Sequence, residues 1–469
     1  MPLPVITIAQ MREWEKATWA TGQTEAEVIR RVGEVVAQHA LRLTKKGDLL
    51  LILAGKGHNG DDARAAMQHL ADRRVDLLNV QDPSKDLPQL ETSLSQRPDL
   101  IIDGLFGIGV NRPLDVEWRQ FIQRVNGSRT FVLAVDVPSG LHADTGEPQG
   151  TAMCAAVTLT VGAPKIGFLQ PQAWDFVGRL EVADGVGLVP CPFQTELNWT
   201  LLQDFIGFPP RRPVASHKGI HGHLAILAGS VGYHGAAVLA ARGAQRAQPG
   251  LVTLHTIEKA YVPVAAQLQA VMVATWASPA NFSEHYNALV AGPGLAATDV
   301  PDDLKTSFAK TWSKASLAVL TDASALSWLP PGEVPQNAIR VITPHPGEAA
   351  RLLETEAKAI QANRLDALRR LSKKFGDTWV VLKGHQTLIG RSTGAVFVNS
   401  SGNPYLAQGG SGDTLSGYLG GLLAQPTLQS DLLTTIRYAV WQHGATADLL
   451  QATKPGWVVE DLVAALGSA

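Results

Sequence analysis

Short apolar runs that end abruptly at glycine, aspartate or proline recur along the whole chain. In the first half, Leu49–Ala54 runs into Gly55, and the runs at 100–103 and 131–136 each end in an aspartate followed by a turn residue. Such continuous runs, with helical spacing between them, are typical of parallel strands buried on both faces. Because ligands bind beyond the carboxyl ends of such strands, we expect a ligand crevice beside these three strand ends.

The second half repeats the alternation. Strands are predicted at 223–228, 250–254, 288–291, 317–320, 340–343 and 379–382, with helices between them, such as 236–248. A polar stretch rich in proline, from 189 to 213, separates the two halves, and 469 residues are enough for two domains. We therefore predict an α/β protein with two domains, at residues 1–195 and 200–469, each built around a mostly parallel sheet.

Composition excludes several classes of protein. A formal net charge of −2 gives no electrostatic footprint for nucleic acid or for an acidic membrane. Two cysteines make no disulfide framework, and no Cys/His spacing suggests zinc. The N-terminus lacks a basic segment of a signal peptide, and no apolar run approaches the roughly 20 residues of a membrane span. We expect a cytoplasmic protein without nucleic-acid or membrane partners.

The segment Gly409-Gly410-Ser411-Gly412-Asp413 precedes a predicted helix. Glycines before a helix let backbone N–H groups approach a phosphate, and the helix N-terminus adds positive potential. Asp413, in the first turn, is a candidate general base for a hydroxyl aimed at a phosphoryl group. A glycine-rich turn whose aspartate only stabilises the helix start would look the same, so the segment alone leaves both interpretations open.

Three other strand ends in this half carry residues suited to ligands. Lys383–Thr387 could hold the phosphates or sugar of a nucleotide, and Gly292–Leu295 allows close approach of a ligand. In Thr343–Glu348, two prolines hold His345 extended in front of a predicted helix. A lone histidine is more often structural, but at this place a ligand role is equally plausible.

These motifs occur in the order of one known family. Together with His217–Gly219 and Gly229–Ala237, they closely resemble the ADP-dependent NAD(P)H-hydrate dehydratase family, a branch of the ribokinase-like fold, over residues 200–469. The resemblance implies that ADP phosphorylates the C6 hydroxyl of hydrated NADH or NADPH, and that phosphate then leaves, giving NAD(P)H, AMP and phosphate. Asp413 would take the hydroxyl proton.

The resemblance also implies the contacts of this half. Those to ADP would come from Lys383, Gly384, His385, Gln386, Thr387 and Gly412. Those to the hydrate would come from Ala236, Gly294, His345 and Asp413. Ala237 matches the family motif as well as Ala236 does. Mg²⁺ is expected to bridge the phosphates, through ligands that the motifs do not identify. ATP remains the alternative phosphoryl donor.

The first half has its own glycine-rich segment, Gly55–Asp62, between a strand and a helix. Its spacing matches neither the dinucleotide fingerprint nor a P-loop. Asn59, Asp103 and Ser139 are oxygen ligands, which suit a hard cation better than zinc. The plainer interpretation is that Asp103 and Asp136 only cap turns.

Residues 1–190 resemble the NAD(P)H-hydrate epimerase family, which interconverts the R and S hydrates at C6 and binds potassium. The resemblance assigns potassium to Asn59, Asp103 and Ser139, and acid/base work on the ring to Asp136, within a Rossmann-like three-layer sandwich. Its dinucleotide contacts would be His58, Asn59, Gly60, Asp61, Asp62, Gly107, Ile108, Gly109, Val110, Asn111, Arg112, Pro113 and Asp136.

The glycine-rich segment departs from the family pattern. His58, Asp61 and Ala63 replace the first, fourth and sixth residues of Asn-Asn-Gly-Gly-Asp-Gly. A charge at Asp61 opposes phosphate binding unless the loop shifts or a cation intervenes.

The sequence therefore predicts a bifunctional repair enzyme for hydrated NADH and NADPH, dependent on ADP, Mg²⁺ and K⁺. A homo-oligomer is expected, of an order that the sequence does not fix. The alternative is a ribokinase-like kinase that releases a stable phosphorylated product, fused to a non-catalytic binding module.

Overall fold

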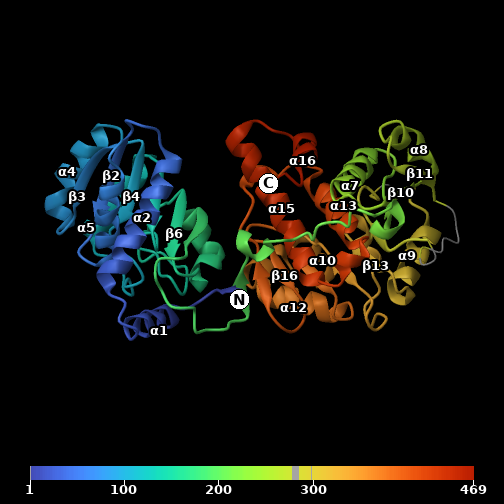
Figure 1. Ribbon diagram of the computed structural model, residues 1–469, viewed down its shortest axis with the longest axis horizontal. Helices are drawn as coiled ribbons and strands as arrows, with labels where there is room; N and C mark the ends of the chain where they lie inside the picture. The colour runs from blue at the N-terminus through green and yellow to red at the C-terminus, as the bar shows by residue number, and fades with distance from the viewer. Residues whose placement is uncertain (1, 277–281, 283–284, 297, 469) are drawn as a thin grey trace. The chain divides into compact units, whose positions relative to one another are not determined.

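The computed structural model describes residues 2–276, 282, 285–296 and 298–468 (Figure 1). The chain divides into two compact units, Leu3–Thr195 and Glu196–Ala469. Among the described helices, none has both the length and the apolar character that a membrane crossing needs.

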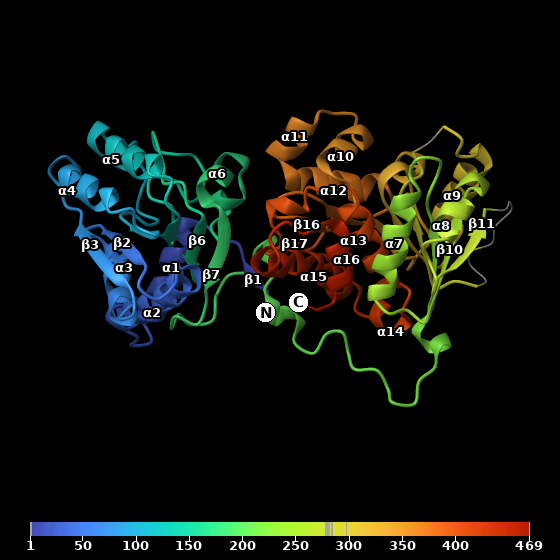
Figure 2. The same ribbon diagram turned by 90° about the horizontal axis from the view of Figure 1, so that it is seen from above.

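The first unit is a three-layer sandwich around a six-stranded parallel sheet. In sheet order its strands are β3 (Arg74–Asn79), β2 (Leu49–Ala54), β4 (Leu100–Gly104), β5 (Val132–Val135), β6 (Val157–Val161) and β7 (Arg179–Ala183). One face packs against α1 (Ile8–Trp19), α2 (Glu25–Leu43) and α3 (His58–Ala66), and the other against α4 (Pro83–Ser95) and α5 (Val116–Gly127). Figure 2 shows these two helix layers on opposite sides of the sheet. The predicted Rossmann-like sandwich is confirmed.

The apolar runs explain this architecture. All six residues of β2 are buried, with alternate side chains entering the cores on the two faces. The chain passes from β2 to β3 on one side and returns to β4 on the other side of β2. Such a reversal opens a crevice beyond the strand ends, and here it opens between β2 and β4.

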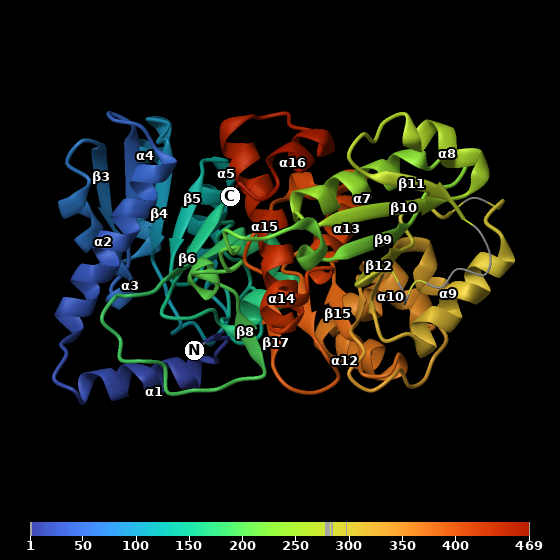
Figure 3. The ribbon, with the colours of Figure 1, turned by 45° about the vertical axis from the view of Figure 1, so that its right-hand side comes forward.

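The second unit is built around a larger, mostly parallel sheet. From β8 onward its order is β8 (Leu197–Trp199), β17 (Val396–Val398), β16 (Leu388–Gly390), β15 (Trp379–Leu382), β14 (Arg340–Ile342), β13 (Ala318–Thr321), β12 (Ala288–Ala291), β9 (His223–Leu227), β10 (Leu251–Thr256) and β11 (Met272–Thr275). Figure 3 shows β9, β10 and β11 side by side. The order reverses between β9 and β12, and at such a reversal we expect a second crevice.

Helices cover this sheet as the spacing of apolar residues predicts. α7 (His234–Arg246), α13 (Ser411–Leu423) and α15 (Leu432–Thr453) share one core with the sheet. The remaining helices include α8 (Glu258–Ala265), α9 (Asp302–Lys314), α10 (Pro346–Leu352), α11 (Ala357–Ala362), α12 (Arg364–Lys374), α14 (Pro426–Gln429) and α16 (Val459–Ala465). The nine predicted strands are all present. The strands that the sequence reasoning missed are β1 (Leu3–Pro4), β3, β6, β7, β8, β11, β16 and β17, of which the last two pair antiparallel.

Candidate active sites

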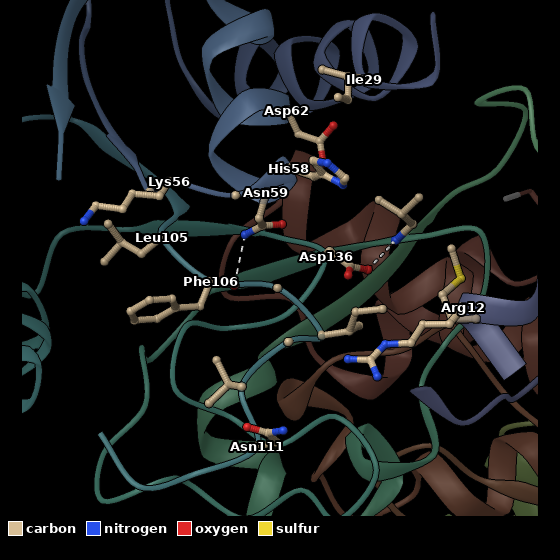
Figure 4. Close-up of a pocket in the computed structure, with 18 of the residues that line it drawn as sticks. Arg12, Ile29, Lys56, His58, Asn59, Asp62, Leu105, Phe106, Asn111 and Asp136 are labelled. Carbon is tan, nitrogen blue, oxygen red and sulfur yellow. Dashed lines mark hydrogen bonds between the residues drawn. The ribbon is translucent and has the colours of Figure 1, made fainter. Parts of the chain in front are cut away.

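A cavity of about 1010 Å³ lies at the carboxyl ends of the first unit's strands (Figure 4). It opens at the reversal between β2 and β4, as expected. Of the residues predicted to contact a dinucleotide, it is lined by His58, Asn59, Asp62, Gly107, Ile108, Gly109, Val110, Asn111, Arg112, Pro113 and Asp136. Gly60 and Asp61 are not among its lining residues.

The second part of the glycine-rich segment is the start of a helix, and only Gly55–Gly57 precede it as a loop. α3 begins at His58, so Asn59 to Asp62 lie in its first turns. Gly60 packs against the strand end, where a Cβ would stand 2.1 Å from the Gly55 carbonyl oxygen. Gly60 is therefore a packing residue in this structure.

Asp61 faces a cation instead of the cavity. Arg64 Nη2 lies 2.7 Å from Asp61 Oδ1 and also donates to the Gly55 carbonyl at 3.0 Å. The sequence raised the possibility that a cation offsets this charge, and Arg64 is that cation. The charge at Asp61 therefore does not oppose an anion in the cavity as a bare carboxylate would.

Asp136 is held by a buried lysine. Lys165 Nζ donates to Asp136 Oδ1 at 2.5 Å, to Thr160 Oγ1 at 2.8 Å and to the Val161 carbonyl at 3.0 Å. The Val161 backbone N–H donates to the same carboxylate oxygen at 3.0 Å. Lys165 is fully buried, and Asp136 has a left-handed φ of 59°. This network holds the Asp136 carboxylate at the cavity wall. An aspartate that only caps a turn would not need a buried lysine as its partner.

Two further carboxyl groups share the cavity. Burial, together with the Asp136 carboxylate, raises the pKa of Glu15. Burial also raises the pKa of Asp62 well above its usual range, with Asp136, Asp61 and Glu15 adding to the effect. The cavity thus contains carboxyl groups in contrasting environments, which is a feature of acid/base sites.

The three residues predicted to bind potassium lie together. Ser139 Oγ donates to Asp103 Oδ1 at 2.6 Å and accepts from the Phe106 N–H at 2.9 Å. Asn59 Nδ2 donates to the Phe106 carbonyl at 3.0 Å, which leaves its own oxygen available. Burial raises the pKa of Asp103 to about 6, although hydrogen bonds from Ser139 and Leu105 oppose the rise. An all-oxygen set of this kind fits a hard cation.

In the second unit, α13 begins at Ser411, directly after Gly410 with its left-handed φ of 94°. Asp413 lies in the first turn, as predicted. Burial raises the pKa of Asp413 to about 6, with the Asp322 and Glu348 carboxylates adding to the rise and Lys383 opposing it. A base with such a pKa is mostly ionised at neutral pH and still able to accept a proton.

Lys383 approaches the same helix start. A Cβ on Gly412 would stand 3.5 Å from Lys383 Nζ, so this ammonium group lies beside the first turn of α13. Lys383 Nζ pairs with the buried Asp322 Oδ1 at 2.7 Å, and Ser416 Oγ donates to Asp322 Oδ2 at 2.6 Å. The motifs did not reveal Asp322, because it follows β13 without a glycine or proline.

The segment after Lys383 is held by another residue that the sequence did not single out. Arg364 donates to the carbonyls of Leu382 at 3.1 Å and Gln386 at 3.2 Å, and also to that of His385. Gly384 has a left-handed φ of 132°, and both Gly384 and His385 are exposed. Thr387 Oγ1 donates back to the Gly384 carbonyl at 3.0 Å. Arg364 therefore shapes Lys383–Thr387 into an open turn.

His345 has a structural role and an exposed ring. Its Nδ1 accepts from the N–H groups of Gly347 at 3.0 Å and Glu348 at 3.3 Å, which caps α10. Glu348 Oε2 accepts from the His345 N–H at 2.8 Å. The side chain of His345 remains 51% exposed. The other ring nitrogen, Nε2, lies 3.6 Å from Glu348 Oε1.

Gly294 and Ala236 lie against each other across the second crevice. A Cβ on Gly294 would stand 2.4 Å from the Tyr233 carbonyl oxygen and 3.0 Å from Ala236 Cβ. Ala236 is partly exposed, whereas Ala237 is fully buried. The geometry therefore favours Ala236 over Ala237 as a surface that a ligand touches.

Both units match known families. Residues 224–464 match the family described as NAD(P)H-hydrate dehydratase, and residues 74–167 match the YjeF-related protein N-terminus. The chain is 33% identical to the bifunctional NAD(P)H-hydrate repair enzyme Nnr of Coxiella burnetii, over 94% of this chain and 93% of that one. It is also 33% identical to the Escherichia coli K12 enzyme of the same name, over 92% and 86%.

Solved structures resemble the second unit. A ribokinase-like superfamily protein from Enterococcus faecalis is 26% identical, with a TM-score of 0.51, over 59% of this chain and 96% of that one. The ADP/ATP-dependent NAD(P)H-hydrate dehydratase of Bacillus subtilis, co-crystallized with ATP and Mg²⁺, is 30% identical, with a TM-score of 0.48, over 55% and 92%. The ribokinase-like fold predicted for residues 200–469 is confirmed.

Fold and sites together define a two-domain α/β enzyme with a Rossmann-like first unit and a ribokinase-like second unit. The relatives narrow this class, because they match nearly the full length of the chain. The chain belongs to the bifunctional NAD(P)H-hydrate repair enzyme family.

Proposed function

We propose that this protein restores hydrated NADH and NADPH, with an ADP-dependent dehydratase in its second unit and an epimerase in its first. The observation that carries the proposal is the start of α13, where Asp413, with its pKa raised to about 6, lies near the Lys383–Asp322 pair. A base and an ammonium group at a helix N-terminus are the parts that phosphoryl transfer to a hydroxyl needs.

In the dehydratase, Asp413 accepts the proton of the C6 hydroxyl as the oxygen attacks the terminal phosphoryl group. The N–H groups at the start of α13 and the Lys383 ammonium stabilise the charge on the transferring group. Phosphate is a far better leaving group than hydroxide, so the C6–O bond then breaks and its electron pair leaves with phosphate. Loss of a proton from C5 to solvent then forms the C5–C6 double bond of the ring. Asp322 holds Lys383 in place through the 2.7 Å ion pair.

Mg²⁺ is bound in proteins by one or two carboxylates together with substrate phosphates. Glu348 fits this requirement, since its carboxylate acts electrostatically on Lys383, which lies beside the start of α13. Glu348 also keeps one oxygen that does not accept from the His345 N–H. Glu348 would hold the ion together with the phosphates, which leaves Asp413 to act as the base, and the ion would neutralise phosphate charge when bound.

The remaining ligand contacts of the second unit are assigned to residues that the structure leaves exposed or partly exposed. We assign ADP to the turn Lys383–Thr387 and to Gly412, with ATP as the alternative donor, and the hydrate to Ala236, Gly294, His345 and Asp413. Support comes from the exposed turn that Arg364 holds, and from the partly exposed Ala236 beside Gly294.

In the epimerase, the large cavity binds the hydrate and Asp136 performs acid/base work at C6. Lys165 keeps the Asp136 carboxylate in position. Potassium, held by Asn59, Asp103 and Ser139, would offset the charge of the dinucleotide's phosphates. The contacts of Asp61 with Arg64 support a working epimerase, because they remove the main objection from the sequence.

A direct test mixes the purified protein with S hydrate, Mg²⁺ and either ADP or ATP, and follows the absorbance of reduced nicotinamide. We expect recovery together with release of free phosphate. A stable phosphorylated product without recovery would indicate the alternative, a ribokinase-like kinase. No reaction with either nucleotide would refute the dehydratase.

A further inference from the structure

Asp62 is a buried carboxyl group without a complete set of partners. It lies in α3 and lines the cavity of the first unit, and it is 8% exposed. Its Oδ1 has no hydrogen-bond partner among the described residues. A buried polar atom without a partner is costly, so each such atom calls for an explanation such as a bound ligand or an added proton.

The groups that face Asp62 are mainly acidic. Asp136 follows β5, Glu15 comes from α1 and Asp61 from the same helix, and each raises the pKa of Asp62 beyond the effect of burial. Glu25 from α2 and His58 from α3 line the same cavity, as do Arg12 and Lys56. The nearby cations Arg64 and Lys165 are bonded to Asp61 and Asp136.

Asp62 and Asp136 therefore occupy one cavity in contrasting environments. One oxygen of Asp136 accepts from Lys165 Nζ and from the Val161 N–H, whereas Asp62 Oδ1 has no partner among the described residues and burial raises the pKa of Asp62. Two carboxyl groups whose environments drive their protonation apart are the usual basis for assigning an acid and a base.

We propose that Asp62 is the second proton carrier of epimerisation, the acid that works with the base Asp136. The inference rests on the proposed epimerase function, and it identifies the group that works with Asp136 when the configuration at C6 is inverted. Inversion needs one group to deliver a proton and another to remove one, and a single carboxylate serves only one of these roles at a time.

The step balances as follows. Asp62 gives its proton to the C6 hydroxyl, the C6–O bond breaks, water leaves, and the electron pair of the neighbouring ring nitrogen forms a C6–N1 double bond. A water molecule then adds to the opposite face of C6 and gives a proton to Asp136. The reaction is redox-neutral, and the end state, with Asp62 ionised and Asp136 protonated, is the starting state for the reverse inversion.

Glu15 is the other carboxyl group that could fill this role. Its environment is mixed, because Lys165, His58 and Arg12 counteract the rise in its pKa. Asp62 is nine-tenths buried and has the unpartnered oxygen. These two observations favour Asp62 as the proton donor.

The test compares Asp62→Asn with wild type in the full-length protein. Asparagine keeps the shape of the side chain but cannot transfer a proton. We expect the kcat for R-to-S conversion, followed by chromatography of the two hydrates, to fall at least about 100-fold. Dehydration of S hydrate with ADP should stay within twofold, which reports that the chain is folded. The matched control is Asp175→Asn, at an exposed aspartate in α6 (Trp174–Val177), and it should epimerise at the wild-type rate.

Two readouts separate proton transfer from a structural role. The loss in Asp62→Asn should appear in the kcat for R-to-S conversion rather than in the KM, because asparagine keeps the shape of the side chain at its contact with the dinucleotide. The wild-type pH profile of kcat/KM should be bell-shaped, and the basic limb should be absent in the residual rate of Asp62→Asn. Conversion by Asp62→Asn at the wild-type rate, or an unchanged profile, would overturn the inference. Absence of epimerisation in wild type would instead refute the proposed epimerase.

Discussion

The buried pair of Lys165 and Asp136 yields the sharpest prediction about the first unit. Lys165→Met removes an ammonium group that is fully buried and makes three contacts of 2.5 to 3.0 Å. The side chain of Asp136 is only 13% exposed, so water cannot replace the lost cation well. Breaking one partner of such a pair costs about 3–5 kcal/mol, because it leaves a buried charge without compensation.

For a unit of this size, about 1 kcal/mol shifts the melting temperature by roughly 2–4 °C. Lys165→Met should therefore lower the melting transition of the first unit by about 6–20 °C, measured by calorimetry. Epimerisation should also be lost below the transition, since Asp136 loses the group that positions it.

A second variant checks the cause. Asp136→Asn in the Lys165→Met background removes the uncompensated charge. The destabilisation of the double variant should therefore be smaller than the sum of the two single destabilisations, by a coupling free energy of about 0.5–3 kcal/mol. Dehydration of S hydrate should be unaffected below the transition. A shift smaller than about 2 °C in Lys165→Met would refute the assignment of this pair as a buried, charged network.

Three further predictions concern the second unit. Asp413→Asn should lower the kcat for dehydration by about 100-fold or more while ADP still binds. The base acts in its ionised form and its pKa is about 6. The wild-type rate should therefore hold above that pH and fall about tenfold between pH 7 and pH 5. Gly294→Ala should raise the KM for S hydrate and destabilise the unit, since the φ of Gly294 is +66° and a Cβ would collide with the Tyr233 carbonyl. Gly232→Ala is the control for backbone strain alone, because Gly232 has a φ of +83° and its Cβ would meet no atom within 4 Å. Arg364→Met should weaken ADP binding at least about tenfold by calorimetry, because the carbonyls of His385 and Gln386 in the ADP turn, and that of Leu382 just before it, lose their donor. An unchanged affinity would contradict that role.

Much of the fold follows from local pattern. Buried parallel strands such as Leu49–Ala54 are continuous apolar runs, and this signal is visible without any neighbour. The motifs at strand ends also predicted most of the glycine-rich and acidic residues that line the cavity of the first unit, since the carboxyl ends of parallel strands share an edge. The strand β7 was missed because Arg179–Ala183 is not a continuous apolar run: it includes the charged Arg179 and Glu181, and only Leu180 and Ala183 are buried.

The residues that the sequence reasoning missed act through distant partners. Lys165 reaches Asp136 across 29 positions, and Asp322 reaches Ser416 across 94. A charge becomes informative only once the fold places its partner beside it. The sequence raised concern about Asp61, and the structure answers it through Arg64, three residues further along the same helix. That spacing is a known pairing distance on helices, so this signal was available and was not used.

The most direct test of the account follows a mixture of R and S hydrates with wild-type protein, ADP, Mg²⁺ and K⁺. If both units are active, the dehydratase consumes the S form and the epimerase refills it, so reduced nicotinamide should be recovered from the entire pool, well ahead of spontaneous epimerisation. A plateau at the initial S fraction would contradict the claim of a bifunctional enzyme and leave the first unit without a catalytic role.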